Sequence, residues 1–390
     1  MLALGYVSMA GALSTDLYLP SFPDLATDFG VGASTVQFTL TALLVGAAFG
    51  QLVIGTVSDA LGRRRTLIAA LILFTLCGYA AAASPTLGVL IAVRAVQGFA
   101  GAAGTVLARA VVADLASRER AVRAFSRLWM MIALGPAIAS PLGAWLTQIG
   151  GWRMALLGLA VIATGMLLVA LLAIPESLPR ERRHVLRAGV LAGNIARLLR
   201  HGPYVGYAVA FGAAYAALIV YISSSSFIVQ NVLGLTPLGY GLTFSLTSVA
   251  FMSGAWLSGR IASALGVVRT FTIAQLLMIA AAAGATALGL ADALSLPAYL
   301  ILACVFSAGS GAVMSSASAL AIGQTGTAAG AASALLGFGQ FVFGAAASPL
   351  GGILGTSTPV PATGFMAVFA GISIAAALVA RALHARRGMR

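Results

Sequence analysis

The chain has 390 residues, of which 60% are hydrophobic and only 8% are charged, and its mean hydropathy is +1.02. A soluble domain carries about a quarter charged residues, so this composition excludes a water-soluble protein. The apolar stretches are continuous and reach the length, about 20 residues, at which a helix spans a bilayer. A membrane β-barrel would instead alternate apolar and polar residues. The sequence therefore predicts an all-α integral membrane protein.

The net charge of +13 comes from 22 basic residues, all of them arginine, against nine acidic ones. In a soluble protein such an excess would indicate nucleic-acid binding. In a membrane protein it indicates topology, because cytoplasmic loops are enriched in basic residues. We therefore expect no nucleic-acid partner.

Twelve membrane spans are predicted, six on each side of a polar linker. The linker covers residues 175–202, the N-terminal bundle covers 1–174, and the C-terminal bundle with its basic tail covers 203–390. The first six spans lie near 2–23, 34–56, 66–84, 87–108, 122–147 and 152–174. The second six lie near 203–229, 237–258, 269–290, 297–320, 327–354 and 360–382.

The arginines support this count of spans. They gather after spans 2, 4, 6 and 8 and in the tail, at 63–65, 109–127, 180–200, 260–269 and 381–390. The opposite loops hold only Arg153, Asp24, Asp28 and Asp292 among charged residues. The positive-inside rule then places both termini and the linker in the cytoplasm, and we expect the linker to lie along the inner leaflet.

Two sequence matches indicate that the halves repeat. Residues 60–66 (ALGRRRT) correspond to residues 264–270 (ALGVVRT), and residues 139–143 (ASPLG) recur as residues 347–351. Chance similarity in such Ala/Gly/Leu-rich sequence is the alternative, and it weakens because both matches occur in the same order at nearly equal spacing. The interpretation is two parallel-repeated six-helix bundles, a transporter architecture with its substrate site at the midplane between the halves.

Two charged residues lie well inside predicted spans. Asp16 is in span 1 and Arg94 is in span 4, each roughly 10 Å below the outer surface by the helix rise. Charges inside a membrane are costly and mark functional sites. We expect both to face one central cavity, where burial favours the protonated form of the aspartate and a nearby cation the ionised form. The alternative is a structural ion pair.

Other polar and aromatic residues inside the spans are candidates to line a cavity for an amphipathic aromatic ligand. Such a pocket needs apolar walls and a few polar anchors. Each single aromatic is more often core or lipid-facing, whereas an amide facing lipid would be unsatisfied. The candidates are Tyr18, Gln37, Gln97, Tyr215, Tyr221, Phe244, Phe338, Gln340 and Phe341.

Span 5 carries prolines and glycines that bend a helix and permit close packing. These residues are Gly135, Pro136, Pro141 and Gly143. Span 11 carries Pro349 with two glycines, and we expect both helices to cross at the interface between halves. Packing without bending is the alternative for each glycine.

Several motifs resemble those of the major facilitator superfamily. The hairpin 55–65 (GTVSDALGRRR) resembles its loop motif between helices 2 and 3, and RAVQGFAGA from Arg94 is similar to a helix-4 motif of drug/proton antiporters. LGPAIASPLGAWL from Leu134 resembles the helix-5 antiporter motif. STDLYLPSFPDL from Ser14 resembles the first helix of the bicyclomycin/chloramphenicol-resistance (Bcr/CflA) branch. Ala60 and Ala144 depart from these motifs, where many members carry a basic residue and a glycine.

The resemblance implies a conformational latch at the cytoplasmic hairpin. We expect Asp59 to accept hydrogen bonds from the N-terminus of a neighbouring helix, and in the family this is the helix-11 end, near Thr325 to Thr327. Arg63 is expected to pair with Asp114. The full set of latch residues is Gly55, Asp59, Gly62, Arg63, Arg64 and Asp114. Arginines that only fix orientation are the alternative.

The resemblance implies proton-coupled export of lipophilic drugs, such as chloramphenicol- or bicyclomycin-like compounds, by alternating access. Asp16 and Arg94 would couple protons. A carrier for a natural metabolite is the alternative. No metal-ligand cluster, nucleophile elbow or phosphate-binding loop occurs in the sequence, so we expect no enzyme activity, cofactor or metal. The predicted protein is a monomer in the bacterial cytoplasmic membrane, with small molecules, protons and lipid as partners.

Overall fold

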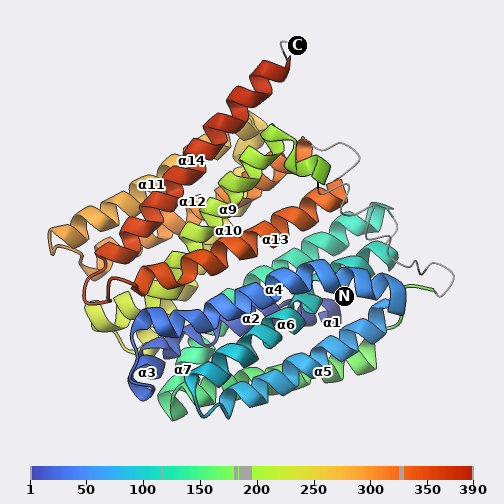
Figure 1. Ribbon diagram of the computed structural model, residues 1–390, viewed down its shortest axis with the longest axis horizontal. Coiled ribbons are helices and arrows are strands. Elements are labelled where there is room, and N and C mark those ends of the chain that lie inside the picture. The colour runs from blue at the N-terminus through green and yellow to red at the C-terminus, as the bar shows by residue number, and fades with distance from the viewer. Residues whose placement is uncertain (1, 116–117, 180–182, 184–195, 325–328, 389–390) are drawn as a thin grey trace. The chain divides into compact units, whose positions relative to one another are not determined.

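The computed structural model describes residues 2–115, 118–179, 183, 196–324 and 329–388. These residues form helices joined by short turns (Figure 1). They fall into two compact units, Met1–Leu186 with Leu235–Ser245, and Arg187–Gly234 with Leu246–Arg390. The predicted bundle boundaries at residues 174 and 203 stay a prediction. Much of the predicted linker, 175–202, lies outside the described residues.

The first unit contains the helices of the N-terminal half. They are α1 (Leu2–Ser8), α2 (Ala10–Asp16), the 3-10 turn η1 (Leu19–Ser21), α3 (Phe22–Asp28), α4 (Ala33–Leu61), α5 (Arg63–Ala82), α6 (Leu87–Leu115) and α7 (Arg118–Ala173). The first turns of α10 (Pro237–Leu265) also belong to this unit.

The second unit contains the remaining helices. They are α9 (Gly202–Phe227) with the π-helical turn η3 (Ile228–Val232), the rest of α10, α11 (Val267–Leu290), α12 (Leu296–Gly323), α13 (Ala329–Ala347) with the 3-10 turn η5 (Ser348–Gly352), and α14 (Val360–Gly388). Pro349 lies in η5, so the helix predicted over 327–354 tightens at its end.

Nine candidate spans among the described residues are long and apolar enough to cross a membrane. The twelve predicted spans correspond to these nine with three additions: α7 counts twice, and α10 and the first predicted span are added. Helix α7 combines two predicted spans, which meet at a kink where the backbone of Gly150 and Gly151 is non-helical. Helix α10 matches a predicted span without being one of the nine.

The first predicted span differs from expectation, because it is not one continuous helix. Helix α2 ends at Asp16, and η1 with Pro20 at its second position precedes the short α3. Proline lacks an N–H group and prevents the ordinary helical bond at its position. The break therefore falls directly after the only carboxylate predicted inside a span.

Glycines allow the long helices of each unit to pack closely. A Cβ built on Gly46 of α4 would lie 1.9 Å from the carbonyl oxygen of Ala95 in α6, and one on Gly98 would lie 1.9 Å from that of Leu43. In the second unit, Gly254 of α10 meets the carbonyl of Ala308 in α12 in the same way, at 2.0 Å. Small residues at such crossings are typical of membrane helices, and their recurrence agrees with a duplicated bundle.

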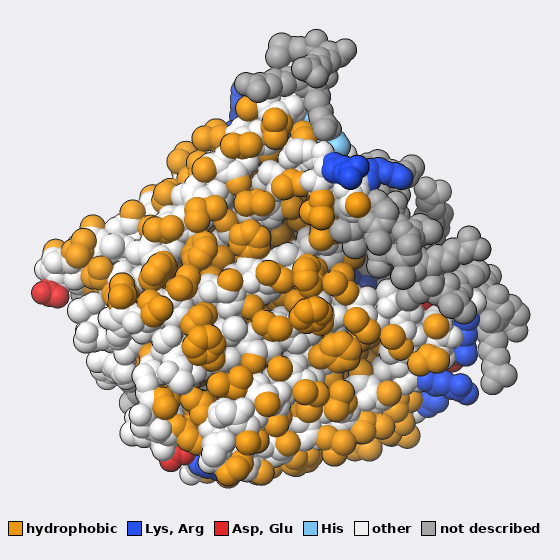
Figure 2. Space-filling view, viewed as in Figure 1, with side chains coloured by type: hydrophobic (Ala, Val, Ile, Leu, Met, Phe, Trp, Pro, Cys, Tyr) orange, Lys and Arg blue, Asp and Glu red, His pale blue; other side chains and the backbone are white. Residues whose placement is uncertain are grey.

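The helix surfaces are apolar. Hydrophobic side chains are spread over the face in Figure 2, and the exposed ones of the whole surface include Leu76 and Leu172, which are 61% and 88% exposed. A soluble protein rarely exposes contiguous apolar area beyond a few hundred Å². The surface therefore fits a hydrocarbon environment.

Candidate functional site

Arg94 of α6 is fully buried and binds helix α2 near the start of the chain. Its Nη1 donates hydrogen bonds to Ser14 Oγ at 3.2 Å and to Gln97 Oε1 at 2.7 Å, and its Nη2 donates to the backbone oxygen of Ser14. The guanidinium carbon lies 4.7 Å from the centroid of the Tyr18 ring. The Nε atom has no partner among the described residues. Arg94 thus fastens α6 to the helix that carries Asp16.

Asp16 is the last residue of α2 and is only 5% exposed. Within the described part of the chain, no hydrogen bond or ion pair is found for its carboxylate. Arg94 binds Ser14, two residues earlier, in place of the ion pair weighed as the alternative. The common cavity and the proton-coupling role of the two residues stay predictions.

The predicted polar residues near Arg94 are buried with it. Tyr18, Gln37 and Gln97 each have no exposed surface. The Tyr18 hydroxyl is hydrogen-bonded to Thr39 Oγ1, whereas Gln97 Nε2 is buried without a partner in the described residues. Ser14 and Thr39 were missed as site residues. The run Ser14-Thr15-Asp16 inside an apolar helix was the signal that could have found the first.

In the second unit, the predicted residues form neutral contacts. The Tyr221 hydroxyl donates to Thr247 Oγ1 at 2.9 Å, and its ring lies 5.8 Å from that of Phe306. The rings of Tyr215 and Phe341 meet edge-on at 6.0 Å. The remaining candidates of this unit are Phe338 and Gln340, which are half-buried on α13. Phe244, which is buried beside Tyr240 on α10, belongs to the first unit.

The helix-5 motif packs against α2 and the residue that follows it, Leu17. A Cβ on Gly143 would lie 1.7 Å from the carbonyl oxygen of Leu17, so only glycine fits there. Gly135, closer to the start of α7, faces Ala12, and a Cβ added to it would lie 3.2 Å from the Ala12 Cβ. Helix α7 continues through Pro136 and Pro141. Bending at these prolines during transport stays a prediction.

Arg63 and Asp114 form the contact that the sequence predicted. Arg63 Nε lies 3.1 Å from Asp114 Oδ2, and Arg63 Nη1 donates to Ser58 Oγ at 2.6 Å and also pairs with Asp59. Arg64 donates from Nε to the backbone oxygen of Ile174 at 2.9 Å. Gly55 allows Val106 to approach from α6. The partner expected for Asp59, near residues 325–327, lies outside the described residues.

Glu176 completes this charged cluster and was missed in the sequence. Its Oε1 accepts a hydrogen bond from the Arg63 backbone N–H at 2.9 Å, at the N-terminus of α5, and its Oε2 lies 3.5 Å from Arg183 Nη2. A Cβ on Gly62, whose φ is +103°, would lie 2.4 Å from Glu176 Oε2. A carboxylate directly after an apolar span, in a chain with nine acidic residues, was the available signal.

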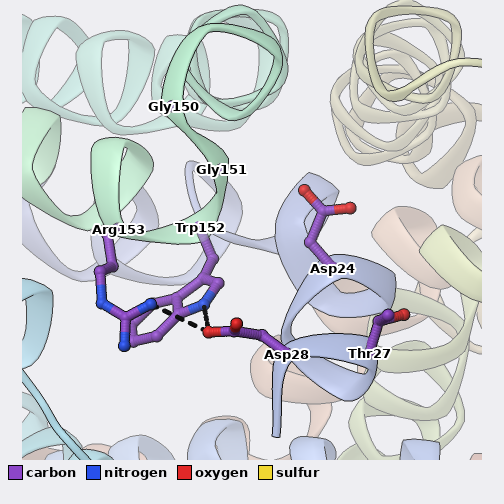
Figure 3. Close-up of a pocket in the computed structure, with 7 residues that line it drawn as sticks. All are labelled: Asp24, Thr27, Asp28, Gly150, Gly151, Trp152 and Arg153. Atoms are coloured by element: carbon purple, nitrogen blue, oxygen red, sulfur yellow. Dashed lines mark hydrogen bonds and ion pairs between the residues drawn. The ribbon is translucent and has the colours of Figure 1, made fainter.

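A pocket of about 420 Å³ lies where α3 meets the turn inside α7 (Figure 3). Trp152 Nε1 and Arg153 Nη1 both donate to Asp28 Oδ2, at 2.8 and 2.9 Å, and these bonds lower the pKa of Asp28. Burial and the charge of Asp28 raise the pKa of Asp24. Thr27, Gly150 and Gly151 complete the lining. Among the described residues, no group of three His, Cys, Asp or Glu could hold a metal ion.

These features define a membrane transporter of duplicated helical bundles, and comparison with known proteins gives its family. Residues 2–349 match the model of the Major Facilitator Superfamily. The chain is 34% identical over 372 residues to the uncharacterized MFS-type transporter YdgK of Bacillus subtilis (strain 168), and the match covers 94% of this chain and 91% of that protein. It is 28% identical over 364 residues to a bicyclomycin resistance protein homolog of Haemophilus influenzae, covering 93% and 90%.

The fold agrees with solved structures. The chain aligns to the xylose transporter XylE from E. coli, in a partially occluded inward open conformation, with a TM-score of 0.76 at 16% identity, covering 97% of this chain and 95% of that one. The chain therefore belongs to the Major Facilitator Superfamily, and its relatives support the Bcr/CflA branch. The predicted fold class and family resemblance are confirmed.

Proposed function

We propose that the protein exports lipophilic drugs, chloramphenicol- or bicyclomycin-like compounds, in exchange for protons. The observation that carries this proposal is that one unit buries both an acidic and a basic side chain on neighbouring helices. Within the described residues, the Asp16 carboxylate has no hydrogen bond or ion pair. Arg94 binds Ser14 of the same short helix. Coupling requires a group whose protonation depends on its surroundings, and a carboxyl group meets this requirement when it passes between water and an apolar interior.

Substrate class follows from the chemistry of the predicted lining. Its described members in the second unit are aromatic rings, hydroxyls and one amide, with no charged side chain. Such walls suit a lipophilic molecule with a few hydrogen-bonding groups. The relative from Haemophilus influenzae is named for bicyclomycin resistance, which supports the same class.

Alternating access needs a switch, and we assign it to the hairpin between α4 and α5. Arg63 there contacts Ser58, Asp59 and Asp114. A cluster of partly exposed charges can break and re-form at modest cost, because each such pair contributes about 0–1 kcal/mol. Asp59→Asn should therefore slow turnover while leaving drug binding nearly unchanged. Loss of binding in a folded variant would contradict this assignment.

The excess of arginine supports a location in the bacterial cytoplasmic membrane with both termini inside. The same rule places the hairpin cluster and the linker on the cytoplasmic side and the Gly150–Gly151 turn on the outer side. The protein acts as a monomer in this proposal, with no cofactor or metal.

The test is drug resistance in a bacterial host that lacks its own efflux pumps. Wild-type protein should raise the inhibitory concentration of chloramphenicol or bicyclomycin, and Asp16→Asn and Arg94→Ala should remove that protection. Asp24→Asn is the matched control, since it neutralises a carboxylate outside the predicted spans. In proteoliposomes, an imposed pH gradient should drive uptake of labelled drug by the wild type.

Two results would overturn the proposal. Full pH-driven transport by Asp16→Asn would exclude this residue as the proton carrier. Unchanged susceptibility to both drugs and to other lipophilic antibiotics, at equal expression, would favour a carrier for a natural metabolite.

A further inference from the structure

The segment that follows Asp16 is short, broken and attached to α7. Helix α2 ends at Asp16, η1 spans Leu19–Ser21 and α3 ends at Asp28. Helices shorter than about 12 residues are marginal by themselves. The position of this segment must therefore be fixed by contacts with its neighbours.

The first two contacts are made inside the predicted span. The carbonyl oxygen of Leu17 lies against Gly143, where a Cβ would come within 1.7 Å. One turn further, Ser21 Oγ and Thr147 Oγ1 are hydrogen-bonded at 2.7 Å, with both residues buried. Ser21 follows Leu17, and Thr147 follows Gly143, by the same number of residues. The segment and α7 therefore run parallel to one another between these two contacts.

The third contact lies at the end of the segment (Figure 3). Asp28 accepts hydrogen bonds from Trp152 Nε1 at 2.8 Å and Arg153 Nη1 at 2.9 Å. The Arg153 guanidinium carbon lies 4.1 Å from the centroid of the Trp152 ring, which also meets the Phe29 ring at 5.4 Å. Gly150 and Gly151 break α7 just before Trp152, and the contacts with Asp28, Arg153 and Phe29 hold its ring.

We propose that this row of contacts positions Asp16, and that Ser21, Thr147 and Asp28 are positioning residues for proton coupling. The inference rests on the proposed role of Asp16 as the proton carrier. The chain between Asp16 and Leu17 is a single peptide bond, so the fit of Leu17 against Gly143 sets where the Asp16 carboxylate lies. The outer contacts keep that fit in register along α7.

The matched control comes from the same helix. Asp24 lies four residues before Asp28 and lines the same pocket, but no hydrogen bond or ion pair is found for it within the described residues (Figure 3). Asp24→Ala and Asp28→Ala thus remove the same side chain from one helix. Only Asp28→Ala removes the acceptor for Trp152 and Arg153.

The experiment is hydrogen–deuterium exchange of the full protein in lipid nanodiscs, which requires no knowledge of the drug. Asp28→Ala should speed exchange in peptides covering residues 13–21 by about fivefold, the factor that corresponds to the net loss of about one hydrogen bond, because the bond from the half-exposed Arg153 contributes little. Asp24→Ala should leave those peptides within about twofold of wild type. Faster exchange confined to residues 22–28, or equal effects of both variants, would overturn the proposal.

A second pair of variants keeps the test open if Asp28→Ala does not fold. Ser21→Ala removes the bond to Thr147, whereas Ser8→Ala removes a bond of 2.7 Å that stays within α1, to the Gly5 carbonyl. Ser21→Ala should loosen residues 13–21, and Ser8→Ala should not. Asp28→Asn keeps an acceptor for Trp152, so it should recover part of the protection.

A functional readout separates this inference from the proposal on which it rests. In proteoliposomes with labelled chloramphenicol as the probe, Asp28→Ala should shift the pH at which transport is half-maximal, and Asp24→Ala should not. If Asp16→Asn keeps the wild-type pH profile, the proton-carrier role fails. If Asp16→Asn loses it while Asp28→Ala behaves like Asp24→Ala, only the positioning role fails.

Discussion

Two hairpins occupy equivalent places in the halves of the chain, yet they carry different chemistry. Gly62 between α4 and α5 has φ +103° and ψ 149°, and Gly266 between α10 and α11 has φ +83° and ψ 151°. The backbone is therefore nearly the same. Around Gly62 lie Glu176 and Arg183, whereas a Cβ on Gly266 would meet nothing within 4 Å.

The residues after each glycine repeat this contrast. Arg63 has three polar side-chain partners, while no hydrogen bond or ion pair is found for Arg269 within the described part of the chain. At the place of Asp59 the second hairpin has Ser263, whose hydroxyl bonds the carbonyl of Arg260 in its own helix. The turn is thus alike in both halves, whereas among the described residues only the first of the two hairpins has ion pairs around it.

The interiors differ in the same direction. The first unit buries Asp16 and Arg94. In the described residues of the second unit, the buried polar groups are neutral, as in the bond of 2.9 Å from Gln275 Nε2 to Ser373 Oγ. Among the described residues, the first bundle therefore buries charged groups that can bind or release a proton, and the second buries only neutral polar groups. We infer that proton chemistry and switching belong to the first half.

The largest expected effect comes from Arg94→Lys. A lysine keeps the charge but cannot reach Ser14 and Gln97 together, because it lacks the planar fork of arginine. Loss of one hydrogen bond to a charged group is worth about 1.5–3 kcal/mol, so drug transport in proteoliposomes should fall about tenfold or more. The matched change in the second unit, Gln275→Leu, should alter transport less than about twofold. Equal losses in the two variants would remove the distinction between the halves.

The sequence predicted the architecture well, because its signals are physical necessities in lipid. Apolar length, arginine placement and two repeated motifs were enough for twelve helices in two bundles. The break after Asp16 was not predicted, since the hydropathy of residues 2–23 is continuous and Pro20 lies near the expected end. The Gly150–Gly151 turn was expected as a loop and appears as a kink within α7.

Side-chain partners were harder to predict than helices. Arg63 with Asp114 followed from two charges at one predicted membrane surface. Ser14 as the partner of Arg94, and Glu176 as the partner of the Arg63 backbone, depend on how the helices are rotated about their axes, which hydropathy does not specify. Their distances along the chain, 80 and 113 residues, place both contacts beyond any local pattern.

Gly62→Ala tests the hairpin itself. The backbone region of Gly62 and Gly266 is nearly restricted to glycine, and a residue with a side chain there costs of order 1–3 kcal/mol. Gly62→Ala should therefore destabilise the purified protein, and Gly266→Ala should do so less, because only the first also displaces Glu176 and Arg183. Thermal unfolding in detergent measures both. A larger loss for Gly266→Ala would contradict the crowding around Gly62.

Arg63→Ala should have a smaller effect on stability. Its side chain is 12% exposed and that of Asp114 is 21% exposed, so solvent screens the pair only in part. We expect a loss of about 1 kcal/mol in the free energy of unfolding. Arg269→Ala should stay within about 0.5 kcal/mol of wild type. If Arg63→Ala and Arg269→Ala lower the free energy of unfolding equally, the ion pairs of the first hairpin do not stabilise it more than the second.

The smallest effect concerns two loops that are predicted to face outward, where Asp28 in the first half contrasts with Asp292 in the second. Hydrogen bonds from Trp152 and Arg153 hold the pKa of Asp28 below the ordinary value of 3.8. A carboxyl group with a lowered folded-state pKa stabilises the fold above its unfolded pKa, and this contribution is lost as the pH falls from 3.8 through the lower value. Because both side chains of the ion pair are nearly half exposed, the contribution should be a few tenths of a kcal/mol.

Melting temperatures at two pH values measure this contribution. Those at about pH 6 and about pH 3, on either side of the unfolded pKa, should differ slightly more for wild type than for Asp28→Asn. Asp292→Asn should match wild type at about pH 6, because Asp292 has φ +50°, a conformation that asparagine tolerates. An identical pH response of wild type and Asp28→Asn would show that Asp28 contributes no stability above its unfolded pKa.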